Sequence, residues 1–168
     1  CPANLPAVQK GVPFKEHYNI LVNPFPIFPR HLTIPEQAHV DQRIASRMED
    51  MLDLAQALTD YVIFYNGPKC GASAPDHAHF QAGNKGFLPV EKDWRNQIAG
   101  KVVEVEEATL WYLKDSPRAT LVIESSSKEK ASHLFDAIYR SLTVKPGEEE
   151  PMMNVLALYE DNKWVVFV

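Results

Sequence analysis

The segment that most constrains the fold spans residues 41–65, where a helical pattern passes directly into a strand pattern. In residues 41–60 the apolar side chains recur at the spacing of an amphipathic helix, and Asp41 stands where a helix N-cap is expected. Residues 61–65 (YVIFY) are β-branched and aromatic, and the turn signal Asn66-Gly67-Pro68 follows them. The segment therefore predicts a long helix that leads into a buried strand.

Short apolar runs that predict further strands lie on both sides of this segment. Residues 17–23 and His31–Pro35 are separated by NPFPIFPR, whose prolines cannot donate to a central ladder, so we expect a hairpin with a broad, stiff connection. Later strands are predicted at residues 102–106, 109–113, 119–124, 155–159 and 164–168. Turn residues separate them, Asp115-Ser116-Pro117 before the third and Asp161-Asn162 before the fifth.

A second amphipathic helix is predicted among these strands. Ser126 and Glu129 have capping-box spacing, and apolar residues then recur at helical spacing, at Ala131, Leu134, Phe135, Ile138 and Leu142. The order strand, strand, helix, strand, strand thus occurs once clearly and once in a degraded form. We expect an α+β fold with helices packed on an antiparallel sheet. Residues 1–88 would form a catalytic half and residues 89–168 a second α+β half, interpreted as a degenerate repeat packed with the first as one unit.

The composition excludes several classes of partner. The 168 residues are 45% hydrophobic and 23% charged, which suits a globular protein with one well-buried core. The formal charge of −5 and the absence of a basic cluster argue against nucleic acid. No apolar run approaches the roughly 20 residues that span a bilayer, and two cysteines are too few for a disulfide scaffold. We therefore expect no membrane partner and a cytoplasmic location.

The ends of the sequence carry two further expectations. The sequence begins with Cys1 rather than Met, and residues 164–168 are predicted to form a strand with nothing to close it. We therefore expect a piece of a longer protein. An open edge strand also favours a homodimer, because an unpaired strand can accept another chain.

The residues that carry chemistry lie in the run NGPKCGASAPDHAHFQ, residues 66–81. If residues 77–82 form a strand, its period of two places His77, His79 and Gln81 on one face. An imidazole is a good nucleophile toward phosphorus when a hydrogen bond holds one ring nitrogen and leaves a lone pair on the other. Gln81 can grip a phosphoryl oxygen while being a poor acid. The pattern predicts nucleophilic chemistry at a phosphate.

The loop before this strand has residue types that suit a phosphate. Gly71, Ala72 and Ser73 offer a closely approaching backbone, amide donors and one hydroxyl. Lys69 can add positive charge near a leaving group. We expect this loop to lie beside the three polar side chains of the strand.

Together these residues resemble the histidine-triad (HIT) superfamily, in the branch of galactose-1-phosphate uridylyltransferases, diadenosine-tetraphosphate phosphorylases and GDP-hexose phosphorylases. That branch carries His-x-His-x-Gln, as residues 77–81 do, where the hydrolytic branch has a third histidine. The match includes Asn66-Gly67-Pro68 and Gly71-Ala72-Ser73, and it is strong over residues 17–83. It implies a HIT-like sheet and a nucleotidyltransferase or phosphorylase.

The resemblance implies a role for each matching residue. His79 would form the covalent nucleotidyl-histidine, and the carbonyl of His77 would hold its other ring nitrogen. Gln81 and Ser73 would bind the transferred α-phosphate, and Asn66 would orient it. The reaction would be a double displacement, in which a second phosphate takes the nucleotidyl group from the histidine.

The resemblance also implies the partners. The substrate would be a nucleoside-diphosphate sugar or a dinucleoside polyphosphate, with phosphate or a sugar phosphate as the second reactant, and the chemistry requires no cofactor. Asn19 and the rest of the hairpin, residues 19–34, would wall the nucleoside. Cys1, His39 and His77 match zinc ligands of several relatives, although a closed structural zinc site takes four ligands.

Two other functions remain open. The protein would be a nucleotide hydrolase if water reached the intermediate on His79, or it would be a nucleotide-binding module without catalysis. Histidines outside the motif, namely His17, His31 and His133, are interpreted as structural or surface residues. Cys70 is interpreted as a small loop residue, because nothing places a base beside it.

Overall fold

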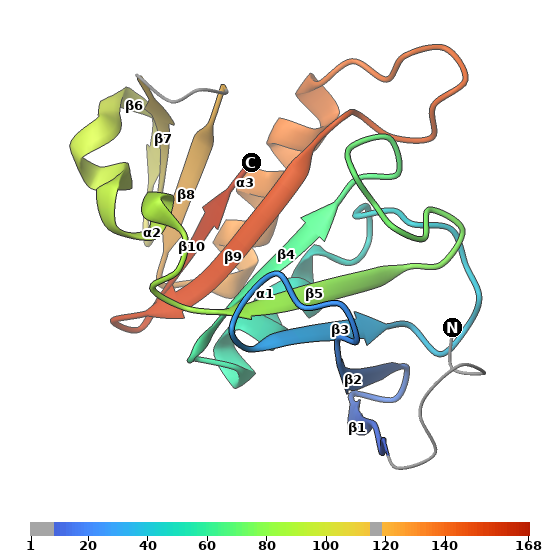
Figure 1. Ribbon diagram of the computed structural model, residues 1–168. Helices are drawn as coiled ribbons and strands as arrows, with labels where there is room; N and C mark the ends of the chain where they lie inside the picture. The colour runs from blue at the N-terminus through green and yellow to red at the C-terminus, as the bar shows by residue number, and fades with distance from the viewer. Residues whose placement is uncertain (1–8, 115–118) are drawn as a thin grey trace.

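The computed structural model describes residues 9–114 and 119–168, which form one ten-stranded antiparallel sheet with helices packed on it (Figure 1). The predicted α+β class is confirmed. The first half contains β1 (Val12–Phe14), β2 (Tyr18–Val22), β3 (His31–Pro35), α1 (Met48–Ala57), β4 (Tyr61–Asn66) and β5 (His79–Asn84). The second contains α2 (Pro89–Asp93), the 3-10 helix η2 (Trp94–Gln97), β6 (Ile98–Val105), β7 (Ala108–Leu113), β8 (Leu121–Ser125), α3 (Lys128–Ser141), β9 (Asn154–Glu160) and β10 (Lys163–Phe167).

The strand order is symmetric about the centre of the sheet. It runs β1-β2-β3-β5-β4 and then β9-β10-β8-β7-β6, so the second half repeats the order of the first in reverse. The halves meet where β4 pairs with β9, with Ile63 opposite Ala157. One sheet therefore spans both halves, while a division at residue 88 remains a prediction.

Side chains alternate between the two faces of each strand, and the apolar side chains on one face pack against the two long helices, α1 and α3. Phe80 and Ala82 of β5, like Val166 of β10, belong to the core cluster that includes the buried faces of α1 and α3. Both helices lie behind the sheet in the view of Figure 1. A hydrogen bond of 2.9 Å from Trp164 Nε1 to the Leu52 carbonyl ties β10 to α1. The helices therefore occupy one face and leave the other for different contacts.

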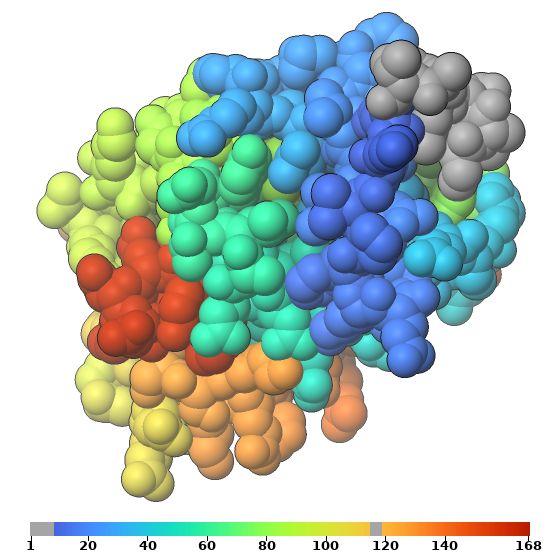
Figure 2. Space-filling view, turned by 90° about the horizontal axis from the view of Figure 1, so that it is seen from below, coloured from blue at the N-terminus to red at the C-terminus, as the bar shows by residue number. Residues whose placement is uncertain are grey.

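Ion pairs join the helices to each other and to the first hairpin. Lys15, between β1 and β2, lies 2.6 Å from Asp53 of α1, and Lys128 of α3 reaches the same carboxylate at 2.9 Å. Figure 2 shows the molecule from below, where the blue β1–β2 segment lies to the right of the teal α1 and the orange α3 lies beneath it. Since these charges are partly exposed, we expect them to contribute less than the apolar core beneath them.

The opposite face differs between the two halves. On the second-half side Trp94 of η2 packs in an apolar cluster with Val62 of β4 and with five residues of the second half, namely Leu113, Val122, Leu158, Val165 and Phe167. In strand order β10 is the counterpart of β5, and its Val165 and Phe167 project to the same side of the sheet as Gln81 and Gly83 of β5. The second half therefore has apolar side chains where the first half has its candidate site.

The first helix is shorter than predicted. It begins at Met48 rather than Asp41, and Arg47 occupies the N-cap position without a side-chain capping bond. The backbone N–H of Gln42 donates to the Pro75 carbonyl at 3.0 Å, and Ser46 has a left-handed φ of 66°. These contacts hold residues 41–47 outside the helix, although their apolar side chains recur at helical spacing.

Three other predictions of secondary structure need correction. Residues 164–168 do not form an open edge, because β10 lies between β8 and β9; among the described strands the edges are β1 and β6. The second helix is capped by Ser127, one residue after the predicted Ser126. The elements β1, α2 and η2 were not predicted. The predicted turn at residues 115–117 lies outside the described residues.

The hairpin at the C-terminal end is confirmed. Asp161 and Asn162, between β9 and β10, both have positive φ, as a two-residue type I′ turn requires. No helix in the described part of the chain has the length and apolar character to cross a membrane.

Candidate active site

The candidate site lies on the first-half face that points away from α1 and α3. Phe80 and Ala82 of β5 belong to the helix-side core, so His79 and Gln81 project to the other side. Two rows of side chains cross this face from β2 through β3 to β5: Asn19, Pro35 and His79, then Leu21, Thr33 and Gln81. The sheet thus brings the predicted residues Asn19, His79 and Gln81 to one face.

The ring of His79 is held by the chain immediately before it. Its Nδ1 donates to the His77 carbonyl at 2.8 Å, which is the contact that the resemblance implied. Because Nδ1 carries the proton, Nε2 presents its lone pair. The residue is only 7% exposed, and burial lowers the pKa of the His79 imidazole below its ordinary value. His79 is therefore neutral at pH 7 and has the form that a nucleophile needs.

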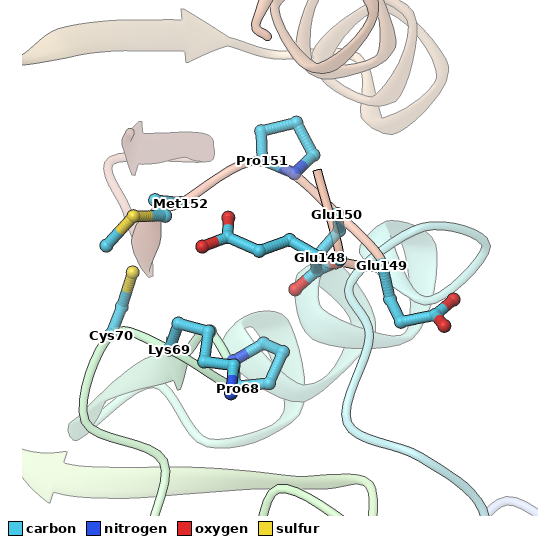
Figure 3. A pocket seen from close by; sticks show the side chains of 10 residues that line it. Pro68, Lys69, Cys70, Glu148, Glu149, Glu150, Pro151 and Met152 are labelled. Carbon is cyan, nitrogen blue, oxygen red and sulfur yellow. The ribbon is translucent and has the colours of Figure 1, made fainter. Parts of the chain in front are cut away.

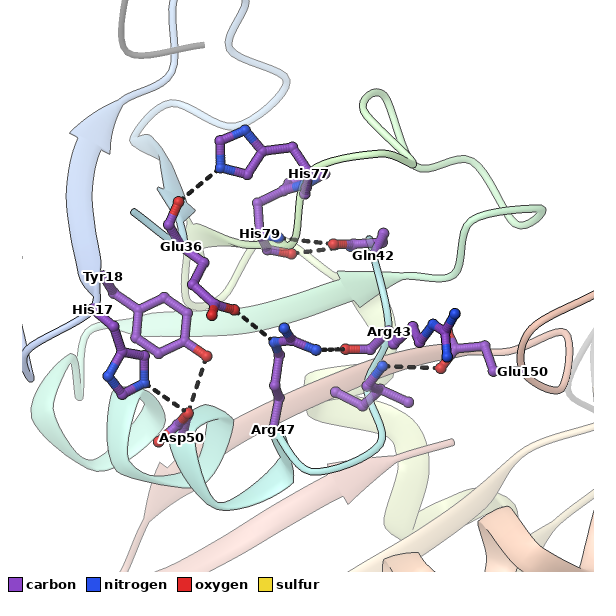
Figure 4. A network of polar contacts seen from close by, with 11 residues as sticks. His17, Tyr18, Glu36, Gln42, Arg43, Arg47, Asp50, His77, His79 and Glu150 are labelled. Carbon is purple, nitrogen blue, oxygen red and sulfur yellow. Dashed lines mark hydrogen bonds and ion pairs between the residues drawn. The ribbon is translucent and has the colours of Figure 1, made fainter. Parts of the chain in front are cut away.

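His77 lies outside the strand that was predicted to contain it. Its backbone N–H donates to Ala74 at 3.2 Å, which closes a turn, and β5 begins two residues later. Its Nε2 lies 2.7 Å from the Glu36 carbonyl, as Figure 4 shows. The prediction that His77 shares a strand face with His79 is wrong, because His77 belongs to the turn that precedes β5. His77 contacts His79 through its backbone rather than its ring.

The predicted zinc ligands are only partly brought together. The rings of His39 and His77 are in contact, with centroids 4.9 Å apart. His39 Nε2 also lies 3.3 Å from a carboxylate oxygen of Asp76, and Cys1 is outside the described residues. Residues 9–114 and 119–168 contain no group of three side chains arranged to hold a metal. Two adjacent histidines fit half of a closed zinc site, so zinc remains a prediction and no step of the chemistry is assigned to it.

Gln81 is oriented by a histidine that the sequence analysis left as structural. The Ile27 amide donates to His31 Nδ1 at 3.2 Å, so His31 Nε2 carries the proton and donates to Gln81 Oε1 at 2.9 Å. Burial lowers the pKa of His31 and keeps its ring neutral. With its oxygen engaged, Gln81 presents its amide nitrogen as a donor. Local patterns could not reveal this pair, because the two residues are 50 positions apart.

Aromatic side chains adjoin these polar groups. Phe28, from the proline-rich connection, lies 5.6 Å by ring centroid from both His31 and Phe64. It sits directly over β5, since a Cβ on Gly83 would be 2.4 Å from the Phe28 ring. Glycine is required there because any side chain would collide with that ring. The site therefore combines the polar side chains of His79 and Gln81 with an apolar wall formed by Phe28 and Phe64.

The predicted phosphate loop, residues 69–73, makes mostly local contacts. Gly71 has a φ of +99°, and the Ala72 amide donates to the Gly67 carbonyl at 3.3 Å. Lys69 and Ser73 are exposed. Within the described part of the chain, no hydrogen bond joins this loop to His79 or Gln81. Its phosphate contacts remain a prediction.

A cavity of about 60 Å³ lies between loop residues 67–70 and 147–152 (Figure 3). The side chain of Glu148 extends toward Cys70 there, and its Oε2 has no hydrogen-bond partner among the described residues. Burial, followed by the charge of Glu148, raises the pKa of the Cys70 thiol. Cys70 therefore stays protonated at neutral pH and is poorly suited to be the nucleophile.

Comparison with protein families gives one match. The family described as "Domain of unknown function (DUF4922)" matches residues 1–84, which include β1 to β5 and the whole His-x-His-x-Gln motif. Among curated proteins nothing matches.

Comparison with solved structures supports the fold. A DUF4931 family protein from Bacillus cereus is 18% identical, with a TM-score of 0.67, and the match covers 94% of this chain and 83% of that one. Yeast Ap4A phosphorylase Apa2 is 22% identical, with a TM-score of 0.58 and coverage of 90% and 56%. The chain thus spans little more than half of the phosphorylase. At these identities the likeness to the phosphorylase branch is one of fold.

The burial of His79 predicts a pH dependence. Between the lowered pKa and the ordinary value of about 6.5, the unfolded chain binds more protons at this residue than the folded protein does. The contribution of His79 to the free energy of unfolding is therefore complete above that interval and is lost as the pH falls through it. An NMR titration of the His79 imidazole should give a midpoint below 6.5; a midpoint at or above it contradicts this electrostatic description.

Proposed function

The chain belongs to the DUF4922 family, and we propose that it is a nucleotidyltransferase that acts through a covalent intermediate on His79. The observation that carries the proposal is the hydrogen bond from His79 Nδ1 to the His77 carbonyl, which leaves Nε2 as a lone-pair donor beside Gln81. The proposed donor is a nucleoside-diphosphate sugar or a dinucleoside polyphosphate. The similar yeast phosphorylase has been crystallised with Ap4A and with AMP, which supports this substrate class.

The proposed reaction has two displacement steps. His79 Nε2 attacks the α-phosphorus, a P–N bond forms, and the P–O bond to the leaving phosphate or sugar phosphate breaks. The leaving oxygen takes the electron pair, and the ring becomes an imidazolium whose Nδ1–H remains bonded to the His77 carbonyl. A second phosphate then attacks the same phosphorus, and the P–N electron pair returns to His79.

Gln81 is proposed to bind the transferred phosphoryl group. Its amide nitrogen donates to a phosphoryl oxygen while its own oxygen stays bonded to His31. A glutamine gives no proton to a leaving group and takes none from water, so it favours transfer to phosphate over hydrolysis. Turnover should therefore depend on an added phosphate or sugar phosphate.

The other residues receive supporting roles in this proposal. Phe28 and Phe64 are proposed to provide an apolar wall for the nucleoside. Asn19 of β2 lies at the far end of the row that crosses β3 to His79. Asn66 is the last residue of β4, its carbonyl is joined to that of His79 through Gln42, and it is proposed to orient the α-phosphate. Ser73 and Lys69 are proposed to reach the phosphates when the loop closes on a substrate, as are the backbone groups of Gly71 and Ala72.

Replacing His79 by Asn should abolish covalent labelling. We expect wild-type protein, incubated with diadenosine tetraphosphate or nucleoside-diphosphate sugars radiolabelled at the α-phosphate, to take up an acid-labile label. The control His133→Asn, at an exposed position on α3, should label like wild type. Retained labelling in His79→Asn would remove this residue from its role. Release of the label at the same rate without phosphate would identify a hydrolase instead.

Replacing His31 by Phe should slow labelling without preventing it. Phenylalanine keeps an aromatic ring beside Phe28 and Phe64 but cannot donate to Gln81 Oε1, so the Gln81 amide is free to rotate. Loss of one oriented hydrogen bond predicts an initial labelling rate about 10-fold lower. A wild-type rate in this variant would show that His31 does not orient Gln81.

A further inference from the structure

The ladder between β4 and β5 ends before it reaches the proposed nucleophile. The last paired residues are Phe64 and Gln81, and the same register would place Asn66 opposite His79. The side-chain amide of Gln42 lies at this point instead. The His79 N–H donates to Gln42 Oε1 at 2.7 Å, and Gln42 Nε2 donates to the His79 carbonyl at 3.0 Å (Figure 4). Gln42 therefore replaces the missing rung of the ladder.

The same amide also reaches the neighbouring strand. Gln42 Nε2 donates to the Asn66 carbonyl at 3.1 Å, so one side chain joins the ends of both strands. Gln42 is 1% exposed, and its oxygen and both hydrogens have backbone partners. A primary amide matches these groups because it offers an acceptor and two donors in one plane. A carboxylate could not donate, and an apolar side chain could do neither.

We propose that Gln42 is a positioning residue for the reaction, a role that rests on the proposed function. His79 is the first residue of β5, and its ring is fixed by the carbonyl only two residues earlier. By holding the backbone N–H and C=O of His79, Gln42 fixes where that ring lies relative to the His77 carbonyl. It sets the tautomer and direction of the nucleophile without touching the substrate.

A loop of the second half anchors the segment that carries Gln42. Glu150, which is 2% exposed, accepts a hydrogen bond of 2.9 Å from the Ile44 amide, and its other oxygen accepts from the Tyr65 hydroxyl. Arg43 pairs with the adjacent Glu149. The second half thus contributes to the position of His79 through Gln42, although it contains no His-x-His motif of its own.

Gln42→Met tests this role, because methionine has nearly the same length and is compatible with burial but cannot make the three hydrogen bonds. The matched control is Gln37→Met, at an exposed position in the same connection. A small misplacement of a reacting group predicts single-turnover labelling about 100-fold slower in Gln42→Met, with the affinity for AMP unchanged. A wild-type labelling rate would overturn the proposal.

A second readout does not depend on activity. Nitrogen-15 NMR of the His79 ring should show protonated Nδ1 in wild type and in Gln37→Met, and mixed tautomers in Gln42→Met. An unchanged tautomer in Gln42→Met would overturn the positioning role even if labelling slowed. Should Gln42→Met fail to fold, Gln42→Glu has the same shape and carries the same two measurements. If wild type takes no label, the proposed function fails, and the tautomer comparison still tests whether Gln42 positions His79.

Discussion

The pairing of β4 with β9 is the contact on which the rest of the structure depends. It places Ile63 opposite Ala157 and makes one sheet out of two halves with the same strand order. Because the pleat is continuous across this pair, α1 and α3 share one face of the sheet and one apolar core. The opposite face is then available along its whole length, and the two halves use it differently.

That difference separates the candidate site from its counterpart. On this face β5 of the first half presents Gln81 and Gly83, whereas its counterpart β10 presents Val165 and Phe167, which pack with Trp94. Polar groups can be buried on the first-half face because each key group has a partner. His79 donates to a carbonyl, and Gln81 is held by a histidine whose other nitrogen accepts from an amide. These bonds fix the orientation of the groups proposed to react.

Sequence patterns predicted the elements whose structure depends on interactions between residues close in the sequence. His31–Pro35 has the bounds expected for it, and the turn at Asp161-Asn162 is present, because apolar runs and turn residues act within a few positions. Two of the features that the patterns missed involve distant partners. Residues 41–47 have helical spacing, yet bonds to Pro75 and Glu150 hold their backbone outside the helix. The face of β5 was predicted from its period of two, whereas its His31 and Gln42 contacts span 50 and 37 positions and leave no local signal.

The most direct test of the central claim is a crystal structure of the protein with bound AMP. Our account predicts that the α-phosphorus lies within about 3.5 Å of His79 Nε2, with a phosphoryl oxygen accepting a hydrogen bond from the Gln81 amide nitrogen. It also predicts the adenine against Phe28 and Phe64. AMP bound on the helix side of the sheet, or bound with His79 Nε2 turned away from phosphorus, would contradict it.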